Sequence, residues 1–559
     1  MILNLHNVIF QKIHLVDCLW FEISLIFEGG YYMKRMHLFL LSLFFILFMT
    51  ACASEPDETS SGNDGGDEGS GGDLVIANMA DAVSLDPVTV NDVPSFDIQS
   101  NIFERLVKHD EEMELQPGLA ESWESIDDTT WEFKLQEGVT FHDGSEFNAD
   151  VVKANVERVI DPEVAAPGAN YLEMIDEIEI VDDYTIRFIT EFPFSLLPSH
   201  FAHNVSGIVS KEQIEEDYEA MEDGKEPGTV INENPIGTGY FKFESWTPGE
   251  SVTLVKNEDY WDGEAKLNSV TFKVVDEDLT RVAEVETGDS HITNPLSPSD
   301  LEQVESADGV HVTEQESLAL DYIGFNTQKE PFDDERVRQA VSMAIDKGQI
   351  VDGIYNGVGQ PAIGPLAPAV PGYDDSVSGL EYDVDQAKEL LADAGYEDGF
   401  STSIWTNDSR ERIDIATNVQ SQLKEIGIDV EVETLEWGAY LDKIGTGEHE
   451  MFILGWSNST ATADTGIYPL FHSDNLGPSG NRTFLDDEEI DTLIEKGRKE
   501  MDEDKRLEIY SDIQEELVER APMIYILHQK YLLGVRDEVK DLVQLPTKVL
   551  YLKDVYIEE

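Results

Sequence analysis

The sequence is poor in cysteine and in basic residues. Its 559 residues include two cysteines, and Lys and Arg number 37 against 115 Asp and Glu, a formal net charge of −78 at pH 7. A basic surface for nucleic acid or for an anionic membrane is thereby excluded. We interpret the acidity as a solvated, solubilising surface. Because the Debye length falls to about 3 Å at 1 M salt and the self-repulsion is then screened, we expect a halophilic setting.

Signatures of catalysis are missing too. The chain has no GxxxxGK[ST] sequence, which excludes a P-loop, and no HExxH zinc motif. The run GWSNS (455–459) begins like a nucleophile elbow but lacks the second glycine of that turn. The 12 histidines are scattered, and HDG (142–144) is more typical of a turn than of a metal site. We therefore expect a binding protein rather than an enzyme, with no metal and no cofactor.

The N-terminal region has the features of an export signal. In MKRMHLFLLSLFFILFMTAC (33–52), two basic residues precede an apolar run, and small residues precede Cys52. The apolar run is short for a membrane span, which needs about 20 residues. The end of this segment, MTAC, resembles the lipobox of bacterial lipoproteins. We predict a lipoprotein signal peptide over 33–51 and lipidation of Cys52; the alternative is an ordinary secretory signal with an incidental cysteine.

The flanking segments complete this prediction. Residues 1–32 place acidic residues ahead of the basic ones, so we interpret them as a mis-annotated upstream extension with Met33 as the true start. Residues 52–72 are acidic and rich in Gly and Ser, which is typical of a flexible tether. Cys52 is then the only cysteine of the processed chain, which excludes an internal disulfide. We expect the protein at the outer face of the cell membrane, anchored by lipid.

From residue 73 onward, strand and helix patterns alternate, which predicts an α/β protein. The segment 401–435 reads as strand, helix and strand, with Gly427 ending the helix, and predicts a βαβ crossover. A helix after Pro331 can be capped by Asp333 or Asp334. Further predicted strands are 130–135, 184–189, 451–456 and 523–527, and further helices are 385–394 and 505–519.

Two segments follow predicted strands at the position where α/β sheets bind ligands, 405–412 and 456–464. Arg410 and Arg412 lie near a predicted helix N-terminus, where guanidinium groups and backbone amides together could bind an anion. The alternative is that these arginines pair with Glu411, Asp414 or other surface acids.

Four sequence blocks resemble one known family. They are WEFKLQEGVTFHDGSEFNADVV (131–152), NPIGTGYFKFESW (234–246), KNEDYW (256–261) and YIGFNTQKEPFDDERVRQAVSMAIDK (322–347). In this order and spacing they are similar to the family 5 solute-binding proteins, the extracytoplasmic receptors of peptide and nickel ABC importers. GWSNSTATADTGIYPLF (455–471), together with IWTN (404–407), is most similar to the glutathione-binding branch.

The resemblance implies a two-lobed, periplasmic-binding-protein-like α/β fold of type II, with an extra subdomain in lobe one and two crossover strands as the hinge. Lobe one is expected over 73–320, with the inserted subdomain at about 110–231. Lobe two is expected over 321–527, and 528–559 return to lobe one. The family is largely monomeric.

The resemblance also implies a ligand site between the lobes. Asp464 would bind the ammonium group of a ligand, and a secluded carboxylate is chemically suited to that role. Trp405 and Trp456 would form walls, with a place in the hydrophobic core as the alternative. The remaining candidates are Asn326, Ser95 and Phe96 for a peptide backbone and Arg410 and Arg412 for a ligand carboxylate.

The expected function is capture of glutathione or a short peptide, closure of the lobes and delivery to an ABC permease and its ATPase. One alternative is a receptor for nickel chelates or oligosaccharides, for which His528 is the one histidine expected near the cleft. A surface peptidase is a second alternative, and it would need a nucleophile or metal cluster that the sequence does not show. A surface chaperone or a receptor that senses peptides without importing them is a third.

Overall fold

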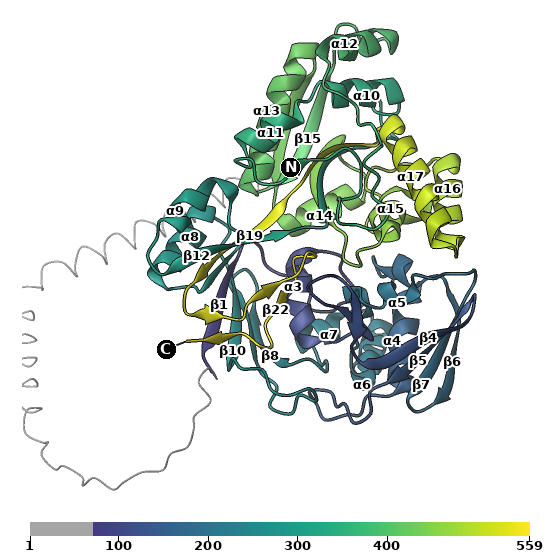
Figure 1. Cartoon of the computed structure of the whole chain (residues 1–559), viewed down its shortest axis with the longest axis vertical. Helices are drawn as coiled ribbons and strands as arrows, with labels where there is room; N and C mark the ends of the chain where they lie inside the picture. The colour runs from purple at the N-terminus through teal and green to yellow at the C-terminus, as the bar shows by residue number, and fades with distance from the viewer. Residues whose placement is uncertain (1–70, 559) are drawn as a thin grey trace, which may run out of the picture. The chain divides into compact units, whose positions relative to one another are not determined.

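The computed structural model describes residues 71–558 (Figure 1). A seven-stranded mixed sheet has the order β12-β19-β11-β1-β10-β9-β8. Strand β1 pairs in parallel with β10 and β11, and the other pairs are antiparallel. The strands are β1 (Asp73–Asn78), β8 (Phe241–Thr247), β9 (Ser251–Lys256), β10 (Ser269–Val274), β11 (Ile292–Asn294), β12 (Val310–Glu316) and β19 (Lys530–Arg536).

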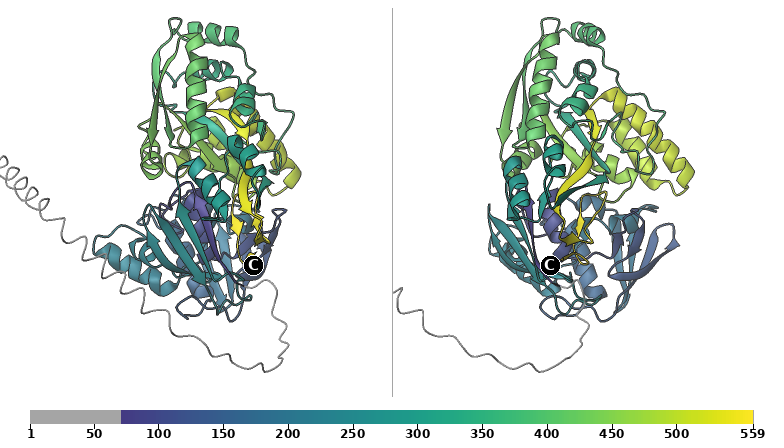
Figure 2. Two further views of the ribbon diagram at one scale, coloured as in Figure 1. Left: turned by 90° about the vertical axis from the view of Figure 1, so that its left-hand side faces the viewer. Right: turned by 60° about the vertical axis from the view of Figure 1, so that its left-hand side comes forward.

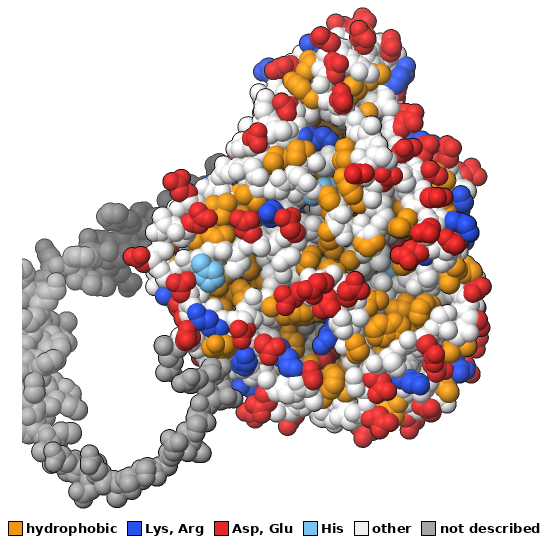
Figure 3. All heavy atoms as spheres, viewed as in Figure 1, with side chains coloured by type: hydrophobic (Ala, Val, Ile, Leu, Met, Phe, Trp, Pro, Cys, Tyr) orange, Lys and Arg blue, Asp and Glu red, His pale blue; other side chains and the backbone are white. Residues whose placement is uncertain are grey.

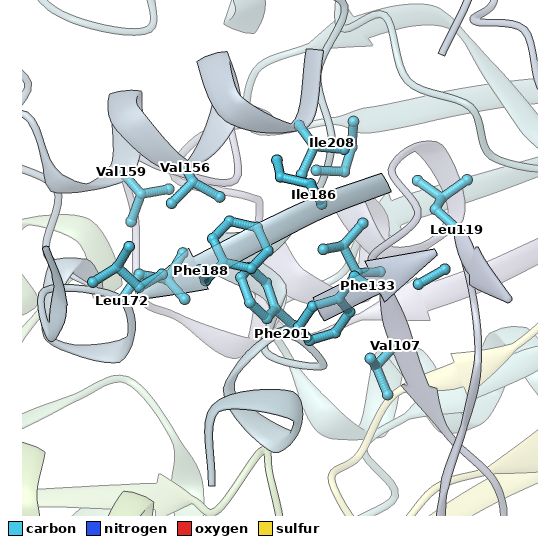
Figure 4. Packing of buried hydrophobic residues seen from close by; sticks show 14 of the residues in the cluster. Val107, Leu119, Phe133, Val156, Val159, Leu172, Ile186, Phe188, Phe201 and Ile208 are labelled. Atoms are coloured by element: carbon cyan, nitrogen blue, oxygen red, sulfur yellow. The ribbon is translucent and has the colours of Figure 1, made fainter. Parts of the chain in front are cut away.

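A four-stranded antiparallel sheet, β4-β5-β7-β6, is inserted after the first helix of the chain's described part. Its strands are β4 (Ala120–Asp127), β5 (Thr130–Leu135), β6 (Ile175–Asp182) and β7 (Thr185–Thr190). The predicted strands at 130–135 and 184–189 are confirmed. One face carries a buried aromatic cluster in which the rings of Phe133, Phe188 and Phe201 lie 4.7–5.5 Å apart between centroids, a spacing typical of favourable aromatic pairs (Figure 4).

A six-stranded sheet has the order β14-β18-β13-β17-β15-β16. Its strands are β13 (Ala319–Phe325), β14 (Gln360–Pro361), β15 (Ser401–Asn407), β16 (Asp429–Leu435), β17 (Met451–Ser457) and β18 (Met523–His528). Strands β15 and β16 pair in parallel and are connected by α13 (Arg410–Leu423), so the predicted βαβ crossover is confirmed. Figure 2 shows this green helix alongside the strands.

Both faces of this sheet are covered by helices, which is why its strands are apolar on both sides. Tyr322 and Phe452 face one core, while the adjacent Ile323 and Ile453 face the other. The helices are α10 (Glu335–Met343), α11 (Lys347–Gly353), α12 (Val384–Asp393), α14 (Trp437–Gly445), α15 (Ala463–Phe471), α16 (Glu488–Lys499) and α17 (Glu503–Arg520). Asp334 caps α10, Gly395 follows α12 with φ 88°, and α17 matches the predicted C-terminal helix.

The remaining helices pack around the other two sheets. They are α3 (Val93–Ile102), α4 (Ala149–Ile160), α5 (Leu197–His200), α6 (Lys211–Glu222), α7 (Thr229–Glu233), α8 (Asp278–Thr287) and α9 (Leu301–Glu305). We call the part of the chain around the seven- and four-stranded sheets lobe one (71–316 and 530–558), and the part around the six-stranded sheet lobe two (319–528). The chain passes between the sheets at residues 317–318 and again at 529, between directly successive strands.

Two further features bear on function. Among residues 71–558, no helix is both long and apolar enough to cross a membrane. On the face drawn in Figure 3, acidic side chains are spread over most elements, with Lys and Arg interspersed among them. The predicted signal peptide, Cys52 and the tether to residue 70 lie outside the described residues.

Candidate functional site

A cavity lies between the two lobes. It contains about 1400 Å³ of space, including solvent at its mouth, and both lobes line it. Lobe one contributes α3, the segment that follows it, and the turn between β21 (Val543–Gln544) and β22 (Leu550–Tyr551); lobe two contributes β17, α14 and Arg482. The principal lining residues are Asp92, Phe96, Asp97, Arg105, His109, Tyr171, His203, Asp321, Arg412, Trp437, Gly455, Trp456, Ser459, Arg482, Tyr531 and Lys548.

The lining is shaped by local sequence. Asp92 caps α3 by accepting a hydrogen bond from Ser95 N at 3.1 Å, and this fixes the helix so that Phe96 and Asp97 reach the cavity. On lobe two, Gly455 in β17 lines the cavity directly opposite Asp321 in the strand register. An added Cβ at Gly455 would lie 2.8 Å from Asp321 Oδ1 and 3.3 Å from Arg412 Nη2. The glycine therefore gives these two charged side chains room.

Many polar atoms of the cavity have no protein partner. The unpartnered and buried atoms include Asp92 Oδ2, Asp97 Oδ1, Arg105 Nε, His109 Nε2, Asp321 Oδ2, Trp437 Nε1, Ser459 Oγ and Arg482 Nε. Buried polar groups are satisfied in most proteins, because each one left alone costs about 1–3 kcal/mol. Their concentration around one cavity indicates a binding site.

Burial changes the protonation of the acidic lining. It raises the pKa of both Asp97 and Asp321 to about 6, although Lys548 near Asp97 and Arg412 near Asp321 act in the opposite direction. Burial also lowers the pKa of His109 to about 4, so this imidazole is neutral at pH 7. At neutral pH the cavity thus holds carboxylates that are costly to keep ionised without a bound cation.

The pH dependence of stability tests this conclusion. The pKa of Asp97 is higher in the folded than in the unfolded chain, so the folded state binds more protons between about pH 4 and 6, and stability rises as pH falls through this window. On acidification from pH 7 to 5, we expect the free energy of unfolding of the ligand-free wild type to increase by about 1 kcal/mol more than that of Asp97→Asn. Urea unfolding at the two pH values measures this difference. The exposed Asp259→Asn is the control; equal pH slopes for Asp97→Asn and wild type would contradict the prediction.

Three of the predicted site residues line the cavity: Trp456, Phe96 and Arg412. Trp456 is 8% exposed and is oriented by a hydrogen bond from its Nε1 to Thr465 O at 2.9 Å. Arg412 lies over the ring of Trp437 at 5.6 Å and donates to Asn407 Oδ1 at 3.0 Å.

Three others are buried away from it. Trp405 lies in the core of lobe two, which was the alternative to its role as a wall. The Asn326 side chain donates to Gly447 O at 3.0 Å and His449 O at 3.2 Å, so it ties two loops of lobe two together. Ser95 Oγ accepts from Val83 N at 2.9 Å and Ser84 N at 3.3 Å. The polar groups of Asn326 and Ser95 are therefore used within the protein.

Arg410 connects the lobes instead of lining the cavity. Its Nη1 lies 2.9 Å from Asp300 Oδ2 and 3.7 Å from Asp278 Oδ2, both on lobe one. This corresponds to the alternative of pairing with acids, although the partners are distant in the sequence rather than Glu411 or Asp414.

Asp464 does not line the cavity and is already neutralised. Its carboxylate lies 3.2 Å from Arg498 Nε, 3.2 Å from the Tyr510 hydroxyl and 3.2 Å from Nε2 of His200, which belongs to lobe one. Burial would raise the pKa of Asp464, but Arg498 and His200 hold it below its ordinary value. Asp464 Oδ2 makes no hydrogen bond within the described residues, but it lies beside His200 and outside the cavity, so the structure does not bring this carboxylate together with the other candidate site residues.

Other contacts join the lobes near Asp464. The Asn170 amide of lobe one donates to Asn475 Oδ1 at 2.8 Å and to Ser479 O at 3.3 Å on lobe two, and Arg506 donates to Ser195 Oγ at 2.9 Å. Together with the His200–Asp464 contact, they form what we call the interlobe clasp. These contacts exist only when the lobes are close, so they stabilise the closed arrangement.

Loosening the clasp should weaken binding of every ligand equally. Asn170→Ala removes about 1 kcal/mol from the closed state, and we expect an approximately fivefold loss of affinity for chemically different ligands, measured by calorimetric titration. Gln303→Ala is the matched control, because it removes a hydrogen bond that the Gln303 side-chain amide donates to Glu286 Oε1 within lobe one. A loss confined to one ligand would instead place Asn170 in the binding site.

The histidines lie differently from the expectation drawn from the sequence. His528 does not line the cavity; its Nδ1 bonds to Ala319 O at 2.9 Å, and burial lowers its pKa to about 4. The cavity histidines are His109 and His203, which were not predicted. Among residues 71–558, no group of three or more His, Cys, Asp or Glu side chains is placed to hold a metal ion.

Sequence reasoning also missed the cations Arg105, Arg482 and Lys548 and the acids Asp97 and Asp321. None of them belongs to a motif with a chemical rationale. The one general signal was the scarcity of basic residues, 37 against 115 acids, which makes a concentration of cations in one place informative.

Known proteins share this architecture. The model of the bacterial extracellular solute-binding proteins, family 5, matches residues 114–478. The glutathione-binding protein GsiB of Pectobacterium atrosepticum is 31% identical over 496 residues, covering 87% of this chain and 94% of that protein. The periplasmic binding protein DppA of Helicobacter pylori, in complex with the peptide STSA, has a TM-score of 0.81 and 32% identity, with 88% and 99% of the two chains covered. The oligopeptide-binding protein AppA of Bacillus subtilis, in complex with a nonapeptide, has a TM-score of 0.82 and 27% identity, with 88% of this chain and 100% of that chain covered.

Proposed function

The chain belongs to the bacterial extracellular solute-binding proteins of family 5, and from this premise we propose that it is the receptor of an ABC importer for glutathione or short peptides. The observation that carries the proposal is the cavity, which is lined by both lobes and surrounded by polar atoms without partners. The relatives named above are binding proteins, which favours capture over catalysis.

The proposed mechanism is closure around the ligand. In the open state water solvates the charged lining; a ligand that satisfies groups on both lobes then favours closure, in which the interlobe clasp forms. A micromolar dissociation constant corresponds to about −8 kcal/mol, which is sufficient to move a closure equilibrium of a few kcal/mol. No bond of the ligand is broken. The closed receptor presents a surface to the permease that the open one lacks.

We propose that the receptor is exported and held at the outer face of the membrane by a lipid on Cys52, with 52–72 as the tether. The lipobox-like MTAC sequence at residues 49–52 supports this. Because a single acyl chain anchors only marginally, stable attachment requires several. Mass spectrometry of the processed N-terminus checks this; an unmodified Cys52 or a start upstream of it would contradict the proposal.

The ligand-binding set that we propose combines Trp456, Phe96 and Arg412 with the cavity residues that the structure adds. Calorimetric titration of the purified protein with glutathione and a panel of di- to pentapeptides, in molar salt suited to its acidity, tests the function. We expect saturable binding of glutathione or of at least one peptide. If no ligand of the panel binds and a nickel chelate or an oligosaccharide does, the protein is a receptor for another ligand class of the same fold.

A further inference from the structure

The cavity concentrates positive charge in a strongly acidic protein. Four cationic side chains line it, Arg105, Arg412, Arg482 and Lys548, against three carboxylates, those of Asp92, Asp97 and Asp321. The whole chain has the opposite balance, with a formal net charge of −78. Seven charged side chains in the proportion of the whole chain, 37 basic to 115 acidic, would include about two cations, so the four cations mark a local enrichment of positive charge.

These four cations are also unpaired. Among residues 71–558, no carboxylate oxygen lies within 4.0 Å of their charged nitrogens. Among the buried arginines elsewhere, Arg158, Arg281 and Arg498 each pair with an acid. Within the described part of the chain Arg338 has no acid partner, but its guanidinium donates to backbone carbonyl groups. Arg482 is 5% exposed, and a guanidinium buried to this extent without an anion is costly. The missing anions are therefore expected on the ligand.

The cations belong to both lobes. Arg105 lies on lobe one, where its Nη1 donates to Asn204 Oδ1 at 2.8 Å, and the neighbouring His109 is neutral. Arg412 lies on lobe two, fixed by Asn407 and by the ring of Trp437. Arg105 and Arg412 are thus held by different partners on different lobes, so each can bind a carboxylate of its own.

The carboxylates provide the complementary position. Asp97 is 2% exposed and keeps one oxygen without a partner, while its other oxygen accepts from the Asn294 amide at 3.2 Å. This arrangement suits an ammonium group, which would supply the missing donor and the missing charge.

We propose that the cavity selects ligands that carry two separated carboxylates and one ammonium group, with one carboxylate on Arg105 of lobe one and the other on Arg412 of lobe two. This rests on the proposed function and narrows its substrate class to peptide-like ligands of net negative charge. Such a ligand links the two lobes by charge-assisted hydrogen bonds, whereas a neutral dipeptide leaves one guanidinium unsatisfied. Glutathione meets the requirement, and so does an ordinary dipeptide with an acidic side chain.

The test compares two ligands of nearly equal shape. Ala-Glu and Ala-Gln differ by one carboxylate, and titration of the wild-type protein in molar salt should show Ala-Glu at least tenfold tighter. Glutathione should likewise bind more tightly than its glycyl ethyl ester, which lacks one carboxylate. Small-angle scattering should show a smaller radius of gyration with saturating Ala-Glu than without ligand. These comparisons need no variant, so they do not depend on the folding of a mutant.

Variants then assign the two carboxylate positions. Arg105→Gln and Arg412→Gln should each lower the affinity for Ala-Glu at least tenfold. One of the two variants should bind Ala-Glu and Ala-Gln equally. Arg336→Gln, on the exposed surface of α10, is the control and should change neither. Equal binding of Ala-Glu and Ala-Gln, or tighter binding of the neutral peptide, would overturn the inference while leaving a peptide receptor. No binding by any panel member would overturn the proposed function and the inference with it.

Discussion

Arg158→Ala is expected to lower the free energy of unfolding by about 3–5 kcal/mol, because it leaves two buried carboxylates without their cation. Arg158 is 1% exposed, and its two Nη atoms contact Asp86 at 2.6 and 3.0 Å and Asp217 at 3.0 Å. Asp217 also accepts from the backbone N–H groups of Gly228 and Val230, so the network joins α4, α6 and the start of α7 to the loop after β1. Urea unfolding measures the loss.

The matched control for this prediction is Arg187→Ala in the same subdomain. Arg187 also pairs with two acids, Glu132 at 2.8 Å and Glu179 at 3.2 Å, but its side chain is 33% exposed. Exposed pairs contribute about 0–1 kcal/mol, so we expect a correspondingly small change. Similar losses for the two variants would show that burial does not determine the energy of these ion pairs.

Gly455→Leu is expected to reduce ligand affinity by at least about 100-fold, or about 3 kcal/mol, while the fold persists. The new side chain would project from β17 into the cavity, where even its Cβ meets Asp321 Oδ1 and Arg412 Nη2 at 2.8 and 3.3 Å. It would both occupy ligand space and displace two charged groups of the lining. Titration with glutathione or the best peptide of the panel measures the effect.

Gly353→Leu serves as the control for this substitution. Gly353 ends α11 on the same lobe, and an added Cβ there meets no atom within 4 Å. We expect unchanged affinity and an unchanged circular dichroism spectrum. Tight ligand binding by Gly455→Leu would mean that the ligand lies elsewhere in the protein.

The sequence predicted the fold better than the site. Elements with regular patterns were found, such as the βαβ unit at 401–435, because burial of one helix face or two sheet faces leaves a local trace in the sequence. The family resemblance supplied the two-lobed architecture.

The site was harder because its residues come from distant parts of the chain. Asp97, Asp321 and Lys548 meet only after both lobes have folded, and no local pattern marks them. Arg410 shows the same limit. Its position near a helix N-terminus suggested an anion site, but its guanidinium donates a hydrogen bond to Asp300, which is 110 residues away in sequence. Asp464 was selected by resemblance, whereas its actual partners, Arg498 and His200, depend on tertiary packing.

The strand order of the seven-stranded sheet sets the order in which the protein can fold. Strand β19, near the C-terminus, is inserted between β11 and β12, which the chain completes more than 200 residues earlier. Until residues 530–536 arrive, β11 and β12 present open edges that could pair with other chains. Lobe one therefore cannot close its sheet during synthesis or export of the first 500 residues, and truncation at the C-terminus should produce aggregation rather than a smaller folded receptor.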